Sequence, residues 1–282
     1  MIKVLIICGP TATGKTVLAA KLARKFNGEL ISADSRQVYK GMDIVTGKDR
    51  PKGVKIHGLD LVLPNEEFSA AHFVKYAHTL INQIHKRGKL PILVGGTGLY
   101  VNSLINPPPT LAVRPNWQLR KKLEKKSVEE LQNQLSQVDA VRWRSMNHSD
   151  QLNPRRLIRA IEVNLQGLSS KVSSRRVPNG NYDTLWIGLT ADKKTLDGRI
   201  EKRVKTRIKA GAIEEWQKLK KQYPAAHPSM TGIGYRELPD VEAWTRAEQQ
   251  YARRQLTWFK KTKAIHWNPD NIAKLVKTWY TK

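Results

Sequence analysis

The first hundred residues carry three short continuous runs of apolar residues. The runs are "KVLIICG" at 3–9, "ELISA" at 29–33 and "LPILVGGTG" at 90–98. Runs of this length, bounded by glycine or charged residues, are typical of strands that are buried on both faces. We therefore predict three core strands in this part of the chain.

Between these runs, apolar residues recur at helical spacing. A first stripe lies in residues 15–26 and a second follows Ser69, a good helix N-cap, and closes near Gly88. The second stripe consists of Ala70, Phe73, Val74, Ala77, Leu80, Ile81 and Ile84. Strands that alternate with helices in this way predict an α/β fold, in which helices flank a parallel sheet.

The pattern changes after the proline cluster "NPPPT" at 106–110. Charged amphipathic helices are expected in "WQLRKKLEKKSVEELQNQL" and "PRRLIRAIEVNLQG", with no strand between them, before "TLWIGLTAD" at 184–192 returns as a strand. We predict a first core part at 1–111, a helical insertion domain at 112–170, and completion of the core with C-terminal helices at 171–282.

The charge of the chain is unusual. Fifty Lys and Arg face 24 Asp and Glu, which gives a net charge of +26 over 282 residues. A surface this positive attracts polyanions, of which nucleic acid is the commonest large one. A generally basic proteome or a solubility device is the alternative explanation.

The single cysteine, Cys8, excludes an internal disulfide and a cysteine-rich zinc site, and its place in an apolar run predicts a small buried strand residue. A reducing cytoplasmic location fits best. The sequence has no run of 18 apolar residues, so we expect no membrane span.

The strongest motif is G-x-x-x-x-G-K-T at residues 9–16. Glycines let successive backbone N–H groups point inward at phosphate oxygens, Lys15 adds a formal charge, and the Thr16 hydroxyl is a ligand for Mg²⁺. The loop follows a predicted strand and opens a predicted helix, which is the context that the motif requires. The residues expected at the phosphates are Gly9, Pro10, Thr11, Ala12, Thr13, Gly14, Lys15 and Thr16.

Two further strand ends carry polar residues. Asp34 follows the second strand and Thr97 lies in the glycine turn after the third. Because parallel α/β folds place ligands at the carboxyl ends of their strands, both should face the phosphate loop. Asp34 suits a base or a metal-bound water, and Thr97 offers a hydroxyl to an oxyanion; a helix cap and a plain glycine turn are the structural alternatives.

Together, these motifs resemble those of the bacterial tRNA dimethylallyltransferases, also called tRNA isopentenyl transferases. The segments that carry the resemblance span nearly the whole chain in the family's order: "GPTATGKT", "LISADSRQVYKGMDIVTGK", "FSAAHF", "PILVGGTGLYVNSL", "NPRRLIRAIEV", "TGIGYRE" and "RRQLTWFKK". The resemblance implies a P-loop NTPase-like sheet with a helical insertion. It also implies transfer of a dimethylallyl group from its diphosphate to the exocyclic amine of an adenosine beside the tRNA anticodon.

The resemblance assigns roles to residues of the core. Asp34 matches the family's general base, Thr97 matches a threonine near the diphosphate, and Lys15 with Mg²⁺ at Thr16 would stabilise the departing diphosphate. The loop would therefore hold a leaving group. Arg199 and Arg203 both fit a family arginine that reaches the diphosphate, and we rank Arg203 first.

Other residues match segments that contact tRNA in the family. They are Asp34, Ser35, Arg36, Gln37, Thr97, Arg120, Arg155, Arg156, Leu157, Ile158 and Arg159. For the arginine run a solvated helix face is the alternative. Core packing is favoured for Trp258 over stacking on RNA, Tyr235 is an alternative stacking residue, and His57 receives no catalytic role.

Three other functions remain open. An adenylate isopentenyltransferase would not need the basic insertion, and a small-molecule P-loop kinase would have no use for "RRLIR". A nucleotide-gated RNA-binding protein without prenyl chemistry would tolerate Asp34→Ala. We expect tRNA and dimethylallyl diphosphate as partners, no membrane, and a monomer.

Overall fold

The computed structural model describes residues 1–167, 182–225 and 227–281. The chain divides into two compact units, Met1–Ile105 with Gly180–Lys282, and Asn106–Asn179. The first boundary predicted from the sequence, 111/112, thus lies inside the second unit. The reason is that Arg159 of that unit hydrogen-bonds the Thr110 carbonyl, which ties the proline-rich segment to it. The predicted boundary at 170/171 falls outside the described residues.

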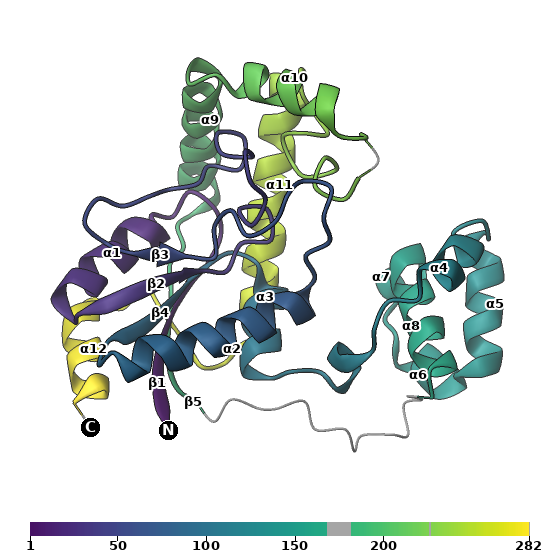
Figure 1. The fold of residues 1–282 in the computed structure, drawn as a ribbon, viewed down its shortest axis with the longest axis horizontal. Coiled ribbons are helices and arrows are strands. Elements are labelled where there is room, and N and C mark those ends of the chain that lie inside the picture. The colour runs from purple at the N-terminus through teal and green to yellow at the C-terminus, as the bar shows by residue number, and fades with distance from the viewer. Residues whose placement is uncertain (168–181, 226, 282) are drawn as a thin grey trace. The chain divides into compact units, whose positions relative to one another are not determined.

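A six-stranded parallel sheet forms the centre of the first unit (Figure 1). Its spatial order is β3-β2-β4-β1-β5-β6. The strands are β1 (Ile2–Cys8), β2 (Gly28–Ser32), β3 (Ile56–His57), β4 (Leu90–Gly95), β5 (Tyr182–Gly188) and β6 (Ile265–Trp267). The parallel sheet and its three N-terminal core strands are confirmed, as is the returning strand β5, which pairs with β1 along its whole length.

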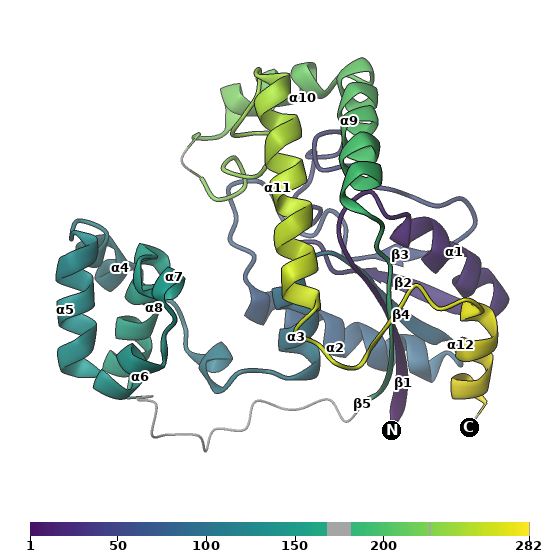
Figure 2. The same ribbon diagram turned by 180° about the vertical axis from the view of Figure 1, so that it is seen from behind.

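Helices cover both faces of the sheet (Figures 1 and 2). α1 (Lys15–Lys25) and α12 (Ile272–Tyr280) share one apolar cluster with alternate strand residues such as Leu5 and Ile7. α2 (Ala70–Lys86) contacts the same strands outside that cluster and therefore lies on the opposite face, with α3 (Gly98–Ile105) beside it. α2 begins at Ser69 in a capping box with His72, as predicted for its N-cap.

Beyond the carboxyl ends of the strands lies a helical layer of α9 (Lys193–Lys209), α10 (Ala212–Gln222) and α11 (Val241–Phe259), which Figure 2 shows above the sheet. These helices enclose a second apolar cluster with the loop that follows β2, including Met42 of that loop and the fully buried Trp244 of α11. The layer thereby holds the loop after β2 against the sheet.

The described part of the second unit consists of the 3-10 helix η1 (Pro109–Ala112) and the helices α4 (Trp117–Leu123), α5 (Val128–Val138), α6 (Ala140–Ser145), α7 (His148–Gln151) and α8 (Pro154–Leu165). The stretch 117–135, interpreted from the sequence as a single helix, is two helices. Ser127 starts α5 with its own capping box to Glu130, and the N-cap geometry ends the previous helix. Leu131 and Leu157 lie in the apolar core of this unit.

Cys8 is fully buried in β1, as predicted, and burial raises the pKa of its thiol to about 12. His57 has a structural role: its Nε2 lies 2.7 Å from the buried carboxylate of Glu29, which also binds Arg87 and Lys89. Burial alone would raise the pKa of Glu29, but these hydrogen bonds outweigh it and lower the pKa to about 2. Within the described residues, no helix is both long and apolar enough to cross a bilayer.

Candidate functional site

The phosphate loop joins β1 to α1, the context predicted from its motif. Gly9 and Gly14 adopt φ angles of +132° and +81°, which L-residues with side chains rarely adopt. A Cβ at Gly9 would collide with the Leu189 carbonyl, so the approach of the chain after β5 also requires glycine there. Thr16 lies in the first turn of α1, where backbone N–H groups are free to receive an anion.

A pocket of about 690 Å³ opens beside this loop. Its lining combines the phosphate loop, the start of α1, residues 43–49 and one side of α9. The residues are Ala12, Gly14, Lys15, Thr16, Val17, Asp43, Ile44, Gly47, Lys48, Asp49, Arg199, Lys202, Arg203, Thr206, Arg207 and Ala210. Cationic side chains outnumber the carboxylates, and this charge balance suits a polyanionic ligand.

Lys15 and Arg203 meet at the loop. The Lys15 Nζ donates to the Pro10 carbonyl at 2.5 Å, which Thr13 also binds through its hydroxyl at 2.9 Å. Arg203 donates from Nη1 to the Thr11 hydroxyl at 2.6 Å, whereas Arg199 lines the same pocket one turn earlier. Burial, and then the charge of Arg203, lower the pKa of Lys15 to about 8. Both arginines thus line the pocket beside the phosphate loop, and their contact with a diphosphate remains a prediction.

Arg207, one further turn along α9, is a pocket residue that the sequence reasoning missed. It is buried, pairs with Glu248 of α11 at 3.1 Å, and fills the space beside Gly47. Burial, and then the charge of Arg203, lower its pKa to about 10. The four-residue spacing of Arg199, Arg203 and Arg207 places them on one helix face and was the available signal.

The residues present fit a magnesium ion that takes most of its ligands from a bound diphosphate and water. Thr16 offers a hydroxyl, and Asp43 and Asp49 line the same pocket. No group of three or more His, Cys, Asp and Glu residues in the described parts of the chain could hold a metal without further ligands. Magnesium is usually bound in this way, by one or two protein oxygens together with phosphates.

Asp34 and Thr97 lie close together at neighbouring strand ends. The Ala33 N–H donates to the Val94 carbonyl at 2.8 Å, and the Ser35 N–H donates to the Thr97 hydroxyl at 3.0 Å. The Asp34 carboxylate accepts the Arg36 N–H at 2.8 Å in a tight turn, and no helix begins there. Asp34 is therefore not a helix cap, and its charge reaches Lys15 across the loop.

The side chains that join these loops come from α11. Gln255 is buried; its Oε1 accepts the Thr11 N–H at 2.9 Å and its Nε2 donates to the Gly96 carbonyl at 3.0 Å. The Tyr251 hydroxyl, one turn earlier, lies close to Thr97, and burial raises its pKa. The segment "RRQLTWFKK" predicted no role for Gln255, because nothing local shows that its partners lie more than 150 residues away.

The glycines after β4 make room for this helix. A Cβ at Gly96 would collide with the amide of Gln255, and one at Gly98 would collide with the indole of Trp258. Trp258 itself is 40% exposed, so its prediction as a core residue is wrong; it packs against Gly98 at the surface. Tyr235, considered for stacking, is instead buried and donates its hydroxyl to Glu215 at 2.5 Å.

The side chains of Arg36 and Gln37, which follow Asp34 in the chain, form hydrogen bonds within the protein. Gln37 donates to the Gly47 carbonyl at 3.2 Å and accepts the Ser32 hydroxyl at 3.0 Å. Arg36 donates to the Pro228 carbonyl at 2.6 Å. Their contact with tRNA remains a prediction that requires these bonds to be exchanged.

In the helical unit, Glu162 organises two of the predicted tRNA residues. Its carboxylate is completely buried and accepts Arg120 Nε and Nη2 at 2.9 and 2.7 Å, and Arg159 Nη1 at 2.5 Å. The side chains of Leu157 and Ile158 lie in the core of this unit. A direct side-chain contact with RNA is therefore open to Arg155 and Arg156 but not to Leu157, which is completely buried.

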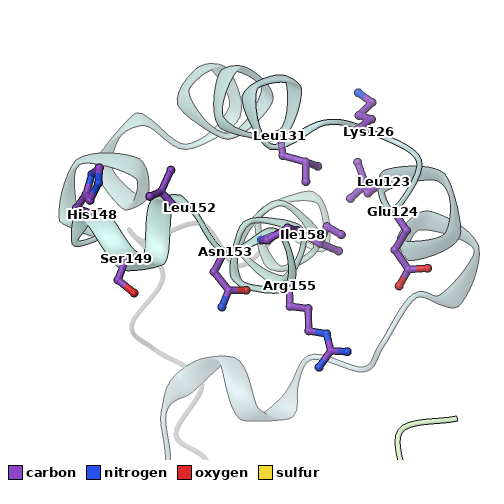
Figure 3. Close-up of a pocket in the computed structure, with 11 residues that line it drawn as sticks. Leu123, Glu124, Lys126, Leu131, His148, Ser149, Leu152, Asn153, Arg155 and Ile158 are labelled. Atoms are coloured by element: carbon purple, nitrogen blue, oxygen red, sulfur yellow. The ribbon is translucent and has the colours of Figure 1, made fainter. Parts of the chain in front are cut away.

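Arg155 lies on the rim of a groove of about 850 Å³ in the helical unit (Figure 3). Leu123, Leu131 and Ile158 form its apolar floor, and Lys126 lies at its edge. Within the described part of the chain, the Arg155 side chain makes no hydrogen bond or ion pair, whereas Arg156 pairs with Asp150.

The sequence is similar to proteins of one family. Residues 37–262 match the family described as IPP transferase. The tRNA dimethylallyltransferase of Acetivibrio thermocellus is 39% identical over 96% of this chain and 93% of that protein. The tRNA dimethylallyltransferase of Staphylococcus aureus (strain JH9) is 38% identical over 96% of this chain and 94% of that protein.

Solved structures give the same picture. The full-length tRNA isopentenylpyrophosphate transferase of Bacillus halodurans superposes with a TM-score of 0.71 at 36% identity, covering 100% of this chain and 95% of that one. A eukaryotic dimethylallyltransferase acting on tRNA gives a TM-score of 0.82 at 27% identity, covering 100% and 77%.

Proposed function

The chain belongs to the IPP transferase family, and we propose that it transfers a dimethylallyl group from dimethylallyl diphosphate to the N6 amine of the adenosine 3′ of the anticodon in tRNA, releasing diphosphate. One observation carries the proposal: a cationic phosphate pocket and the Asp34–Thr97 pair lie at adjacent strand ends of the same sheet. This arrangement provides a leaving-group site beside a base.

In the proposed reaction, the bond between the allylic carbon and the diphosphate oxygen breaks as the adenine nitrogen bonds that carbon. The electron pair leaves with the diphosphate, whose charge Lys15, Arg203 and the N–H groups at the start of α1 stabilise. Magnesium, held by Thr16 and the diphosphate, would add charge neutralisation. No phosphate is transferred, so the loop serves a leaving group.

Asp34 would take the proton that the N6 amine loses. The exocyclic amine of adenine is a poor nucleophile, so removal of its proton during bond formation lowers the barrier. The Ser35 N–H holds the Thr97 hydroxyl beside Asp34, and we assign Thr97 to the diphosphate side of this junction.

The basic helical unit supports tRNA as the acceptor. Arg155 offers a cation that has no ion-pair partner among the described residues of that unit, and a free mononucleotide would not need such a surface. We propose cytoplasm as the location, where tRNA is modified, and a monomer as the active species, since one chain supplies both the phosphate pocket and the base. Light scattering of the active enzyme tests the second point.

The test is incubation with radiolabelled dimethylallyl diphosphate, Mg²⁺ and bulk unmodified tRNA, with AMP and ATP as rival acceptors. Label should enter tRNA. Asp34→Asn should reduce turnover by about 10²- to 10⁴-fold, the usual contribution of a general base, while the dissociation constant for tRNA stays unchanged. Glu67→Gln, which changes an exposed carboxylate of the same unit, is the matched control.

Label in AMP rather than tRNA would replace the proposal with a cytokinin-type nucleotide synthase. Release of phosphate from ATP without label transfer would indicate a kinase or hydrolase. Binding of tRNA with no label in any acceptor would leave an RNA-binding protein.

A further inference from the structure

Trp117, the first residue of α4, is 57% exposed. Large aromatic side chains usually contribute their area to a core, and Trp143 does so in this unit. Trp117 belongs to none of the apolar clusters formed by the described residues. The Trp117 side chain therefore contributes little to the described core of this unit.

One face of the Trp117 ring is supported. The Arg120 guanidinium lies 5.0 Å from the ring centroid, a cation–π distance. Glu162 fixes that guanidinium through two hydrogen bonds and also accepts the Asn116 N–H at 2.6 Å, immediately before Trp117. The buried Glu162 thus holds both the backbone that carries the indole and the Arg120 guanidinium beside the ring. The area that remains exposed lies on the rest of the ring.

The chain on either side of Trp117 carries several cations. Arg114, Lys121 and Lys122 are exposed, and their side chains make no hydrogen bond or ion pair among the residues that the structure describes. Lys121 follows Trp117 by one helical turn and so lies on its side of α4. A protein-binding hot spot would be surrounded by apolar or neutral residues, whereas a rim of free cations suits the phosphates of a nucleic acid.

We propose that Trp117 is a stacking platform for an unpaired base of the tRNA acceptor, with the neighbouring cations Arg114, Lys121 and Lys122 on the flanking phosphates. The inference rests on the proposed function, because it takes tRNA as the ligand. In this proposal, Glu162 holds the Arg120 guanidinium against one face of the indole. Arg120 therefore orients the ring and does not bind phosphate itself.

The test compares Trp117→Ala, Trp117→Phe and Val141→Ala, a control that truncates an exposed apolar side chain on α6 of the same unit. Loss of one stacked base is expected to raise the dissociation constant for tRNA by about 5- to 100-fold in Trp117→Ala. Trp117→Phe should recover most of the affinity. The salt dependence of binding should not change, because no charge is removed, and neither should the KM for dimethylallyl diphosphate.

Wild-type affinity in Trp117→Ala, with prenylation of tRNA by the wild-type enzyme intact, would overturn the platform and leave the proposed function standing. An equal loss in Trp117→Ala and Trp117→Phe would likewise overturn it, because a phenyl ring still stacks. If the wild-type enzyme neither binds nor prenylates tRNA, the proposed function itself fails. A thermal melt of each variant, expected to match the wild-type curve, shows that the helical unit is folded.

Discussion

Lys15 combines two demands that oppose each other at the scale of one residue. Its ammonium lies in the pocket where we propose that the diphosphate binds, and burial, together with Arg203, lowers its pKa to about 8. The charge is therefore nearly complete at neutral pH but is lost within the mildly alkaline range. An arriving diphosphate favours the charged form, so the titration belongs to the free enzyme.

The lowered pKa of Lys15 predicts that kcat/KM for dimethylallyl diphosphate depends on pH. As the pH rises through about 8, Lys15 loses its proton and kcat/KM for dimethylallyl diphosphate should fall, while kcat at saturating donor changes less. In Lys15→Met, kcat/KM should be low at neutral pH and this alkaline limb should vanish. A limb that persists in Lys15→Met would assign the titration to another group. The measurement is initial rate against donor concentration from about pH 6.5 to 9.5.

Among the elements, α11 carries the side chain that joins the phosphate loop to the turn after β4. Gln255 bridges the phosphate loop and the turn after β4, and Tyr251 contacts the Thr97 that this turn holds. Neither residue needs to touch a substrate for the helix to set the spacing between the phosphate pocket and Asp34.

Gln255→Leu should therefore impair donor binding and turnover while the protein still folds. It leaves the Thr11 N–H and the Gly96 carbonyl without their side-chain partner, which costs about 1–3 kcal/mol for each buried group. We expect a higher KM for dimethylallyl diphosphate together with a lower kcat, and an unchanged dissociation constant for tRNA. Gln250→Leu, at an exposed site on the same helix, is the control. Unaltered kinetics in a folded Gln255→Leu variant would remove Gln255 from the scaffold.

The helical unit depends on the completely buried carboxylate of Glu162. Burial alone would raise the pKa of Glu162, but hydrogen bonds from Arg120, Asn116 and Arg159 outweigh it and lower the pKa. Glu162→Gln should destabilise this unit by about 3–5 kcal/mol, as expected when one partner of a buried ion pair is removed. Hydrogen exchange should accelerate in α4 and α8 but not in β1. Equal protection in both proteins would contradict this role.

The elements differ in how well they could be predicted from the sequence. β1, β2, β4 and α2 were predictable because each buries a complete local pattern, an apolar run or a helical stripe. β3 has two residues and β6 three, too few for a periodic signal. The phosphate loop was readable from its spacing, whereas Gln255 and Tyr251 act through contacts that only the folded chain creates.

At the scale of the whole molecule, the net charge of +26 bears on how strongly tRNA binding depends on salt. If six to ten phosphates are contacted, affinity should fall by about 10³-fold or more between about 50 and 200 mM salt. Lys121→Gln with Lys122→Gln should reduce the slope of log affinity against log salt by about one unit for each phosphate that the variant no longer neutralises. A nearly flat slope in the wild-type enzyme would contradict this role and favour the alternative explanation, in which the positive charge is a general property of the proteome.

The position of β5 has a consequence for synthesis. This strand is encoded after the helical unit, yet it pairs along the whole of β1. On the ribosome, β1, β2 and β4 emerge first, and the outer edge of β1 then waits for about ninety residues, on the order of ten seconds of translation. During that interval the nascent sheet has an open hydrogen-bonding edge, on which strands of other chains can pair. A polypeptide that terminates within the helical unit keeps this edge permanently and is expected to aggregate.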